Sequence, residues 1–145
     1  MPTKTKVLFI CVHNSARSQM AEAFLNQIAG DRYVACSAGL EPGQLNPFAV
    51  KVMREAGIDI SNHQTKSVQD ILKKEKTFDI VVTVCDEASA GRCPVIPGKG
   101  ERLHWSFEDP GSVQGTDEAK LTKAREVRDQ IQQRIKEWLR TLREG

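Results

Sequence analysis

The 145-residue sequence has no strong excess of charge of either sign: 21 lysines and arginines stand against 19 aspartates and glutamates, for a formal net charge of +2. Such a balance argues against nucleic acid or a membrane surface as a partner. The sequence also has no apolar run long enough to span a bilayer. Its first apolar stretch, residues 7–12, is too short for the core of a signal peptide. We therefore expect a cytoplasmic protein that contacts no membrane.

The chain also has no internal repeat, low-complexity tract or linker. In the cytosol, four cysteines favour catalysis, redox cycling or metal binding over permanent disulfides. The length, with 39% apolar and 28% charged residues, predicts one globular domain over residues 1–145. No helix presents an obvious interface, so we expect a monomer. The four cysteines are Cys11, Cys36, Cys85 and Cys93.

Hydrophobic periodicity predicts strands that alternate with helices. We expect strands at residues 6–10, 33–36, 79–84 and 102–105, and helices at residues 17–29, 47–56, 67–74 and from residues 116–118 onward. The basic residues of the last helix are most simply its solvated face. This alternation indicates an α/β fold with a mostly parallel sheet covered on both sides.

One segment, Cys11-Val12-His13-Asn14-Ser15-Ala16-Arg17-Ser18, joins the first predicted strand to the first predicted helix. A loop of this length can curl so that its backbone N–H groups converge on one spot, as in other anion sites at helix N-termini. The N–H groups, the helix dipole and Arg17 all favour the thiolate of Cys11 over the thiol. We therefore predict a nucleophilic thiolate that attacks a bound oxyanion. The alternative is a structural cysteine at a strand end and a solvated arginine.

Cys85 directly follows the predicted strand 79–84, as Cys11 follows the strand 6–10. In open α/β sheets ligands bind beyond the carboxyl ends of the strands, so we expect both cysteines at the same edge. Besides a role in catalysis, Cys85 and Cys93 have two possible interpretations. They could be a pair of unrelated buried thiols, or a metal pair with His104. The seven residues between the two cysteines do not match the short spacings of structural zinc sites. We therefore predict no metal and no other cofactor.

Five segments of the chain together form a specific pattern: Val7 to Cys11, Asn14 to Glu22, Ser37 to Gly39, Gly57 to Ser61 and Val81 to Cys85. In combination they resemble the thioredoxin-coupled arsenate reductases of the low-molecular-weight tyrosine phosphatase superfamily. The likeness continues through Cys93-Pro94, His104-Trp105 and Glu108-Asp109-Pro110 to the final helix, and so covers nearly the whole chain. It implies a single-domain, open parallel four-stranded sheet flanked by helices.

The resemblance implies a role for each residue of the loop. Cys11 attacks the arsenic of arsenate, which Arg17 and the loop hold, with phosphate and sulfate as competing oxyanions. Ser18 hydrogen-bonds the thiolate, and Asn14 keeps the loop's shape. The remaining oxyanion-binding and supporting positions are His13, Ser15 and Ala16.

The same resemblance implies how arsenite is released. Asp109 is the general acid for the departing oxygen, although an aspartate before proline is also a common turn residue. Cys85 then attacks the Cys11–arsenic adduct and leaves a Cys11–Cys85 disulfide. Cys93 attacks Cys85 in turn, which gives a Cys85–Cys93 disulfide for thioredoxin to reduce. We expect Cys36 to be a small core residue and Trp105 and Phe107 to be core or loop anchors.

The sequence departs from the family pattern at several positions. Val12 and His13 replace a small Thr-Gly pair, so the loop must accept a side chain at His13, with a positive φ as one option. Ala16 stands where many relatives carry another cysteine, and the Cys85–Cys93 loop is one residue longer than usual. Some relatives bind potassium beside the loop with help from a carboxylate at the position of Lys66. We expect the Lys66 ammonium to pair with Glu22 instead.

The main alternative is a low-molecular-weight protein tyrosine phosphatase that uses Cys11, Arg17 and Asp109. Against it, no tyrosine pair follows Asp109-Pro110, and Gln19 stands where those phosphatases have proline. A phosphatase also has no use for Cys85 and Cys93. A module that only binds an oxyanion is the second alternative, and the full set of nucleophile, arginine and acid argues against it. We interpret His63 as an ordinary loop residue.

Overall fold

Four parallel strands form one sheet in the order β2-β1-β3-β4, which places β1 between β2 and β3. The computed structural model describes residues 4–74, 78–84, 101–108, 110 and 114–144. The predicted fold class is confirmed, and the second strand is three residues longer than expected because Ser37, Ala38 and Gly39 continue the pairing with β1. The strands are β1 (Thr5–Cys11), β2 (Tyr33–Gly39), β3 (Ile80–Thr83) and β4 (Glu101–His104).

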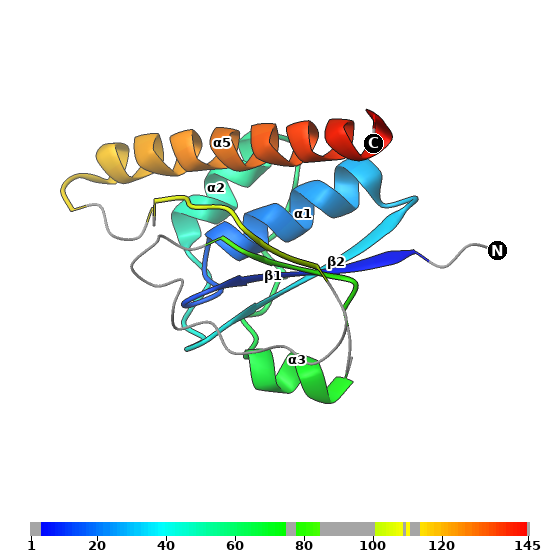
Figure 1. Cartoon of the computed structure of the whole chain (residues 1–145). Coiled ribbons are helices and arrows are strands. Elements are labelled where there is room, and N and C mark those ends of the chain that lie inside the picture. Colours follow the sequence, from blue (N-terminus) through cyan, green and yellow to red (C-terminus); the bar gives the residue numbers. More distant parts are fainter. Residues whose placement is uncertain (1–3, 75–77, 85–100, 109, 111–113, 145) are drawn as a thin grey trace.

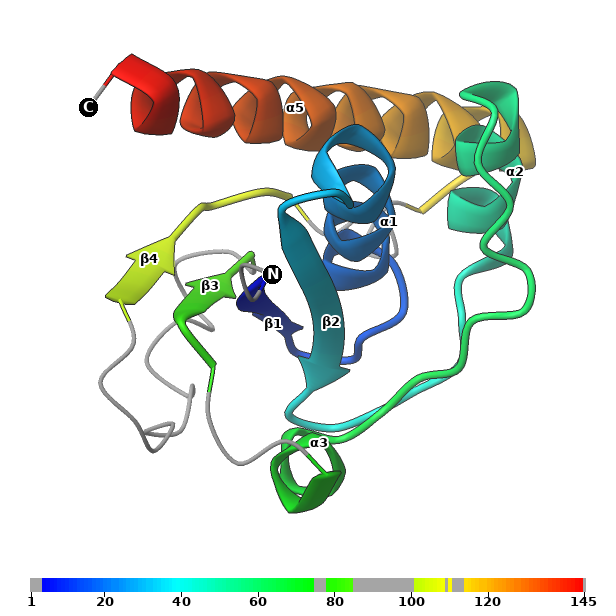
Figure 2. The same cartoon turned by 90° about the vertical axis from the view of Figure 1, so that its right-hand side faces the viewer.

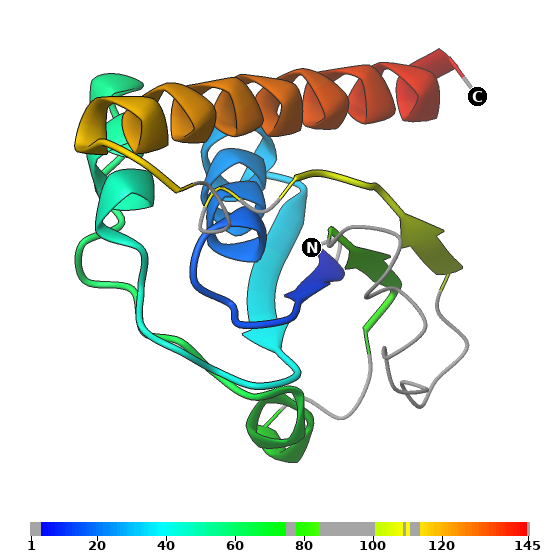
Figure 3. The same ribbon diagram turned by 90° about the vertical axis from the view of Figure 1, so that its left-hand side faces the viewer.

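Helices cover the two faces of the sheet unequally (Figure 1). Three helices, α1, α2 and α5, lie on one side, and α3 lies on the other. Views turned to either side show α5 running across α1 and α2 (Figures 2 and 3). The helices are α1 (Arg17–Ala29), α2 (Pro47–Glu55), α3 (Val68–Lys74) and α5 (Asp117–Glu144). In the described part of the chain, none is long and apolar enough to cross a membrane.

The alternation of side chains along β1 builds a separate core on each face of the sheet. Val7 and Phe9 pack with α1 and α5, whereas Leu8 and Ile10 pack with α3. On α5 one apolar stripe is buried through most of its length, but Leu142 is 45% exposed. Cys36 is partly buried against the core on the α3 side, and Trp105 and Phe107 are buried anchors as predicted. The buried residues of α5 are Ala124, Val127, Ile131, Ile135 and Leu139.

Two arginines of α5 are engaged by α2 rather than lying free on a solvated face. The carboxylate of Glu55 accepts hydrogen bonds from Arg125 at 2.8–3.2 Å and from Arg128 at 3.1 Å. Arg128 also donates to the carbonyl of Val52 at 2.8 Å. The prediction of a simple solvated face is therefore wrong at these two residues, because a carboxylate of the neighbouring helix lies within their reach.

We expect Glu55→Gln to lower the melting temperature at pH 7 and to matter less as the pH falls toward 3. Hydrogen bonds from Arg125 hold the pKa of the Glu55 carboxyl at about 2, below its usual 4.5. A carboxyl with a depressed folded-state pKa stabilises the fold above pH 4.5, and this contribution fades as the pH falls toward 2. Thermal melts of both proteins across this range test it. A pH-independent difference would show that the glutamine disturbs packing instead.

Candidate active site

The loop from Val12 to Ala16 joins the end of β1 to the start of α1, at the edge where the parallel strands end. Cys11 is the last residue of β1, is 2% exposed and pairs in register with Gly39 of β2. On the other side of β1, the N–H of Val84 donates to the carbonyl of Ile10 at 2.9 Å. The residues that precede Cys11 and Cys85 are therefore directly hydrogen-bonded to one another.

Four carbonyl groups in and next to this loop are turned outward, toward the segment that follows β2. Each accepts a hydrogen bond from a backbone N–H of residues 40–46. The pairs are Cys11 with Leu40 (3.2 Å), Val12 with Glu41 (2.8 Å), His13 with Gly43 (3.0 Å) and Ser15 with Asn46 (2.9 Å). In a trans peptide unit the C=O and the N–H point in opposite directions. The N–H groups that share a peptide unit with these four carbonyls therefore face the inside of the loop. This arrangement suits a tetrahedral anion.

The thiol of Cys11 receives two polar contacts inside the loop. Its sulfur lies 2.9 Å from the hydroxyl oxygen of Ser18 and 3.2 Å from the backbone N–H of Asn14. An N–H donor and a hydroxyl both favour the thiolate, which is the nucleophilic form of cysteine. Asn14 is the one described non-glycine residue with a positive φ, at 55°. The residue with the left-handed backbone conformation is therefore Asn14 and not His13. This conformation directs the Asn14 N–H toward the sulfur, and asparagine adopts it more readily than most residues do.

Gly39 packs directly against the loop. A Cβ atom at this position would lie 2.9 Å from the backbone nitrogen of Asn14, the carbonyl carbon of His13 and the carbonyl oxygen of Val12. These are backbone atoms, so a side chain cannot be accommodated by a rotamer change. Glycine is required here because the strand and the loop approach so closely.

We expect Gly39→Ala to lower the activity by on the order of tenfold, because a displaced loop misplaces the bound anion and the thiol. The overpacking should also destabilise the fold by about 1–3 kcal/mol. Steady-state kinetics and thermal melts measure both effects. Gly57→Ala is a useful comparison because nothing lies within 4 Å of its added Cβ, although its φ of +85° adds backbone strain. Equal catalytic losses in both variants would contradict the role assigned to the close approach at Gly39.

Arg17 begins α1, and its side chain is 4% exposed. One nitrogen of its guanidinium donates to the carbonyl of Phe107 at 3.2 Å, so Arg17 connects the loop to the segment after β4. Buried Pro110 lines a hollow of about 250 Å³ together with Ser15 of the loop and Asn46. Phe107 therefore contacts the first residue of α1, and Pro110 lies beside the loop.

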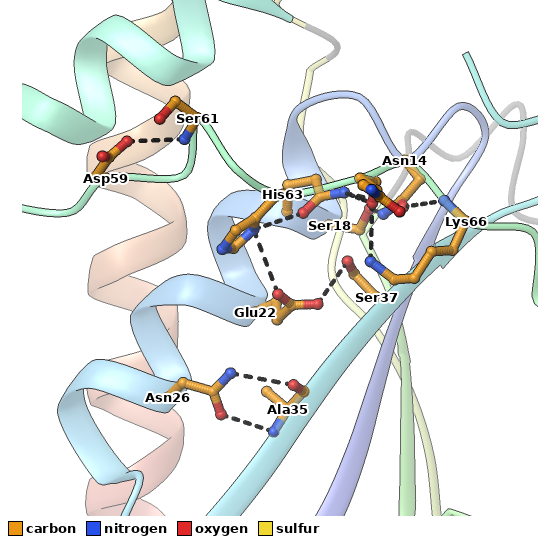
Figure 4. Close-up of polar contacts among 12 residues, drawn as sticks. Asn14, Ser18, Glu22, Asn26, Ala35, Ser37, Asp59, Ser61, His63 and Lys66 are labelled. Carbon is orange, nitrogen blue, oxygen red and sulfur yellow. Dashed lines mark hydrogen bonds and ion pairs between the residues drawn. The ribbon is translucent and has the colours of Figure 1, made fainter. Parts of the chain in front are cut away.

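A network of side chains supports the loop from below (Figure 4). The side-chain oxygen of Asn14 accepts from the N–H of Lys66 at 2.9 Å, and its amide nitrogen donates to Ser18 at 2.7 Å. Gln19, which is fully buried, donates to the same Asn14 oxygen at 3.1 Å. The fold therefore fixes Asn14, the residue with the left-handed backbone, by three side-chain hydrogen bonds.

Two predictions about this network are wrong. The Lys66 ammonium donates to the carbonyl of Gln64 at 2.9 Å, not to Glu22. Glu22 accepts from the hydroxyl of Ser37 at 2.9 Å, and its second oxygen lies 3.5 Å from Nδ1 of His63. His63 thus takes the place expected for Lys66 and is more than an ordinary loop residue.

The structure brings together most of the predicted loop residues but does not test the rest. Cys11, Asn14, Arg17 and Ser18 are buried in and beside the loop, Ala16 is buried and Ser15 is partly exposed. His13 is exposed and its ring contacts the carbonyl of Glu41 at 3.0 Å. The predicted Cys85, Cys93 and Asp109 lie outside the described residues. Sequence reasoning missed Gln19, His63 and the donor segment 40–46. The signal available for Gln19 was a polar residue on the helix face next to Ser18.

Comparison with known proteins places this site in a family. Residues 6–145 match the low molecular weight phosphotyrosine protein phosphatase family. An arsenate reductase from Bacillus subtilis is 46% identical over 136 residues, which cover 93% of this chain and 95% of the relative. A solved arsenate reductase from Archaeoglobus fulgidus is 32% identical with a TM-score of 0.73, over 91% of this chain and 97% of that one. A solved thioredoxin-dependent arsenate reductase from Corynebacterium glutamicum is 31% identical with a TM-score of 0.71, over 97% of this chain and 62% of that one.

The sheet and the cysteine-containing loop define an α/β protein with a buried thiol inside a loop whose shape suits a tetrahedral anion. The comparisons make the assignment specific. The chain belongs to the low molecular weight phosphotyrosine protein phosphatase family and, within it, to the group that contains the arsenate reductases.

Proposed function

We propose that this protein reduces arsenate to arsenite with three cysteines and that thioredoxin returns it to the reduced state. The observation that carries the proposal is the Cys11 thiol, held by Ser18 and Asn14 inside a loop that can bind a tetrahedral anion. The 46% identity to an arsenate reductase supports arsenate as that anion. Phosphate and sulfate share its shape and charge and should compete with it.

In the first step, the Cys11 thiolate attacks arsenic and forms a sulfur–arsenic bond. One arsenate oxygen departs as water after protonation, for which we propose Asp109 as the acid. Arg17 and the inward N–H groups of the loop stabilise the remaining oxygens. Arsenic is still pentavalent in this adduct.

In the second step, the thiolate of Cys85 attacks the sulfur of Cys11. A disulfide forms, the sulfur–arsenic bond breaks, and its electron pair stays on arsenic, which leaves as arsenite. Two thiols thus supply the two electrons. The hydrogen bond between Val84 and Ile10, the residues before the two cysteines, supports this step.

In the third step, Cys93 attacks Cys85, which forms a Cys85–Cys93 disulfide and frees the Cys11 thiolate. The dithiol of thioredoxin then supplies two electrons by thiol–disulfide exchange. The similarity to a thioredoxin-dependent arsenate reductase supports this partner. Because the cycle needs cysteines that are kept reduced, we also propose a cytoplasmic location, and we propose that the protein acts as a monomer.

The test is arsenate-dependent oxidation of NADPH in the presence of thioredoxin and thioredoxin reductase, with glutaredoxin and glutathione as a parallel arm. Turnover that depends on arsenate and thioredoxin is the expected result. Turnover with glutaredoxin but not with thioredoxin would change the proposed reductant and leave the proposed reaction unchanged. No arsenate reduction with either system would overturn the proposal.

Hydrolysis of a small aryl phosphate should be measured on the same protein. The family match favours such a side activity, since the loop that holds arsenate also fits phosphate. Fast hydrolysis without arsenate reduction would make the protein a phosphatase.

A further inference from the structure

A chain of side-chain hydrogen bonds runs from His63 to the Cys11 thiol through three intermediate residues. Nδ1 of His63 lies 2.9 Å from Oε1 of Gln19, and Nε2 of Gln19 lies 3.1 Å from Oδ1 of Asn14. Nδ2 of Asn14 lies 2.7 Å from the Ser18 hydroxyl, which lies 2.9 Å from the sulfur. The three intermediate residues are fully buried, and Figure 4 labels Asn14, Ser18 and His63.

Two backbone groups fix the direction of this chain. The carbonyl of Gln64 can only accept, and it lies 2.9 Å from Gln19, so that atom of Gln19 is the NH₂ group. The Gln19 oxygen therefore faces His63, which must carry its proton on Nδ1. The N–H of Lys66 can only donate, and it lies 2.9 Å from Asn14, so that atom of Asn14 is the oxygen.

With both amides fixed, every bond in the chain donates toward the sulfur. Asn14 donates to the Ser18 oxygen, which leaves the Ser18 hydrogen available for Cys11. A thiolate accepts this hydrogen bond more strongly than a thiol does. Bonds that donate in one direction polarise each other, so the effect of a distant donor adds to that of Ser18.

We propose that Gln19 and His63 are positioning residues that stabilise the Cys11 thiolate through Asn14 and Ser18. The inference rests on Cys11 being the nucleophile of the proposed function. The charged and titratable groups around the relay are Arg17 and Glu22 of α1, Lys66 beside Asn14, and Asp59 on the same segment as His63. The side chain of His63 is 27% exposed, so it can be replaced without opening the core.

The experiment measures alkylation of Cys11 by iodoacetamide as a function of pH. The thiolate displaces iodide, and the rate follows the thiolate fraction. Cys36, Cys85 and Cys93 are first replaced by serine, so that one thiol reports. This background cannot cycle arsenate, and its result is therefore independent of whether arsenate is the substrate.

Gln19→Met keeps the side-chain length and removes both amide contacts. At pH values below the midpoint of the rate–pH profile, it should slow alkylation by about threefold to tenfold. His63→Ala, four bonds away, should slow it by about twofold to threefold. His63→Asn retains a donor at the δ position and should restore the parent profile. His104→Ala, which removes a histidine outside the relay, should leave the midpoint in place.

The limiting rate at high pH separates this role from a merely structural one. A relay that stabilises the thiolate shifts the midpoint upward when broken and leaves the limiting rate within about twofold. A lower limiting rate without a midpoint shift would show that Gln19 only shapes the loop. An unchanged profile in both Gln19→Met and His63→Ala, or a His63→Asn profile like that of His63→Ala, would overturn the proposal.

Discussion

An enzyme with Cys93 replaced by serine should complete about one turnover of arsenate and then stop, because it has no thiol to resolve the Cys11–Cys85 disulfide. The trapped protein should carry this disulfide, which peptide mass mapping can identify. Arsenite should be released in an amount close to that of the enzyme. Rapid mixing with quantification of arsenite measures the burst.

The other cysteines give matched comparisons. Cys11→Ser should lose both arsenate reduction and aryl phosphate hydrolysis, since a serine hydroxyl is a far weaker nucleophile at neutral pH. Cys85→Ser should keep phosphate hydrolysis but release no arsenite, because nothing displaces the adduct. Cys36→Ser is the control, since Cys36 packs on the face of the sheet opposite to Cys11. Sustained thioredoxin-coupled turnover of Cys93→Ser would exclude the three-thiol scheme and favour two cysteines with an external thiol.

The sequence was sufficient to predict the parts of the site that depend on neighbouring residues. The strand before Cys11, the loop and the helix that starts at Arg17 follow from periodicity and from an anion loop's need for converging N–H groups. The contact between Ser18 and Cys11 followed from the family resemblance. The positive φ considered as one option for His13 belongs instead to Asn14, whose N–H points at the sulfur.

Contacts between residues far apart in the chain could not be predicted. His63 lies 44 positions from Gln19, and nothing in its own segment indicates that its ring forms a hydrogen bond with a buried glutamine. Lys66 illustrates the same limit: its charge suggested a pair with Glu22, whereas its backbone N–H is what holds Asn14. The arginines of α5 were likewise interpreted from helical spacing alone, which carries no information about Glu55 of α2.

The second large effect concerns the proposed protonation of the departing oxygen by Asp109. Asp109→Asn should slow arsenate reduction by about 10²–10⁴-fold. The amide keeps the size of the side chain but cannot protonate the departing oxygen. Oxyanion binding should change little, since we propose that Arg17 and the loop N–H groups hold the anion. Arsenate kinetics and phosphate inhibition constants measured on one preparation separate these two effects.

The dependence on the leaving group makes this prediction specific. An oxygen that leaves easily needs little help from an acid, so Asp109→Asn should impair hydrolysis of an activated aryl phosphate less than that of a simple phenyl phosphate. A misfolded loop would impair both equally. The described neighbours of position 109 favour the acid role, because the Phe107 carbonyl binds Arg17 and Pro110 lines the hollow beside Ser15. Unchanged arsenate turnover in Asp109→Asn would assign the proton donor to another group, and a loss equal for both phosphates would assign Asp109 to the support of the loop.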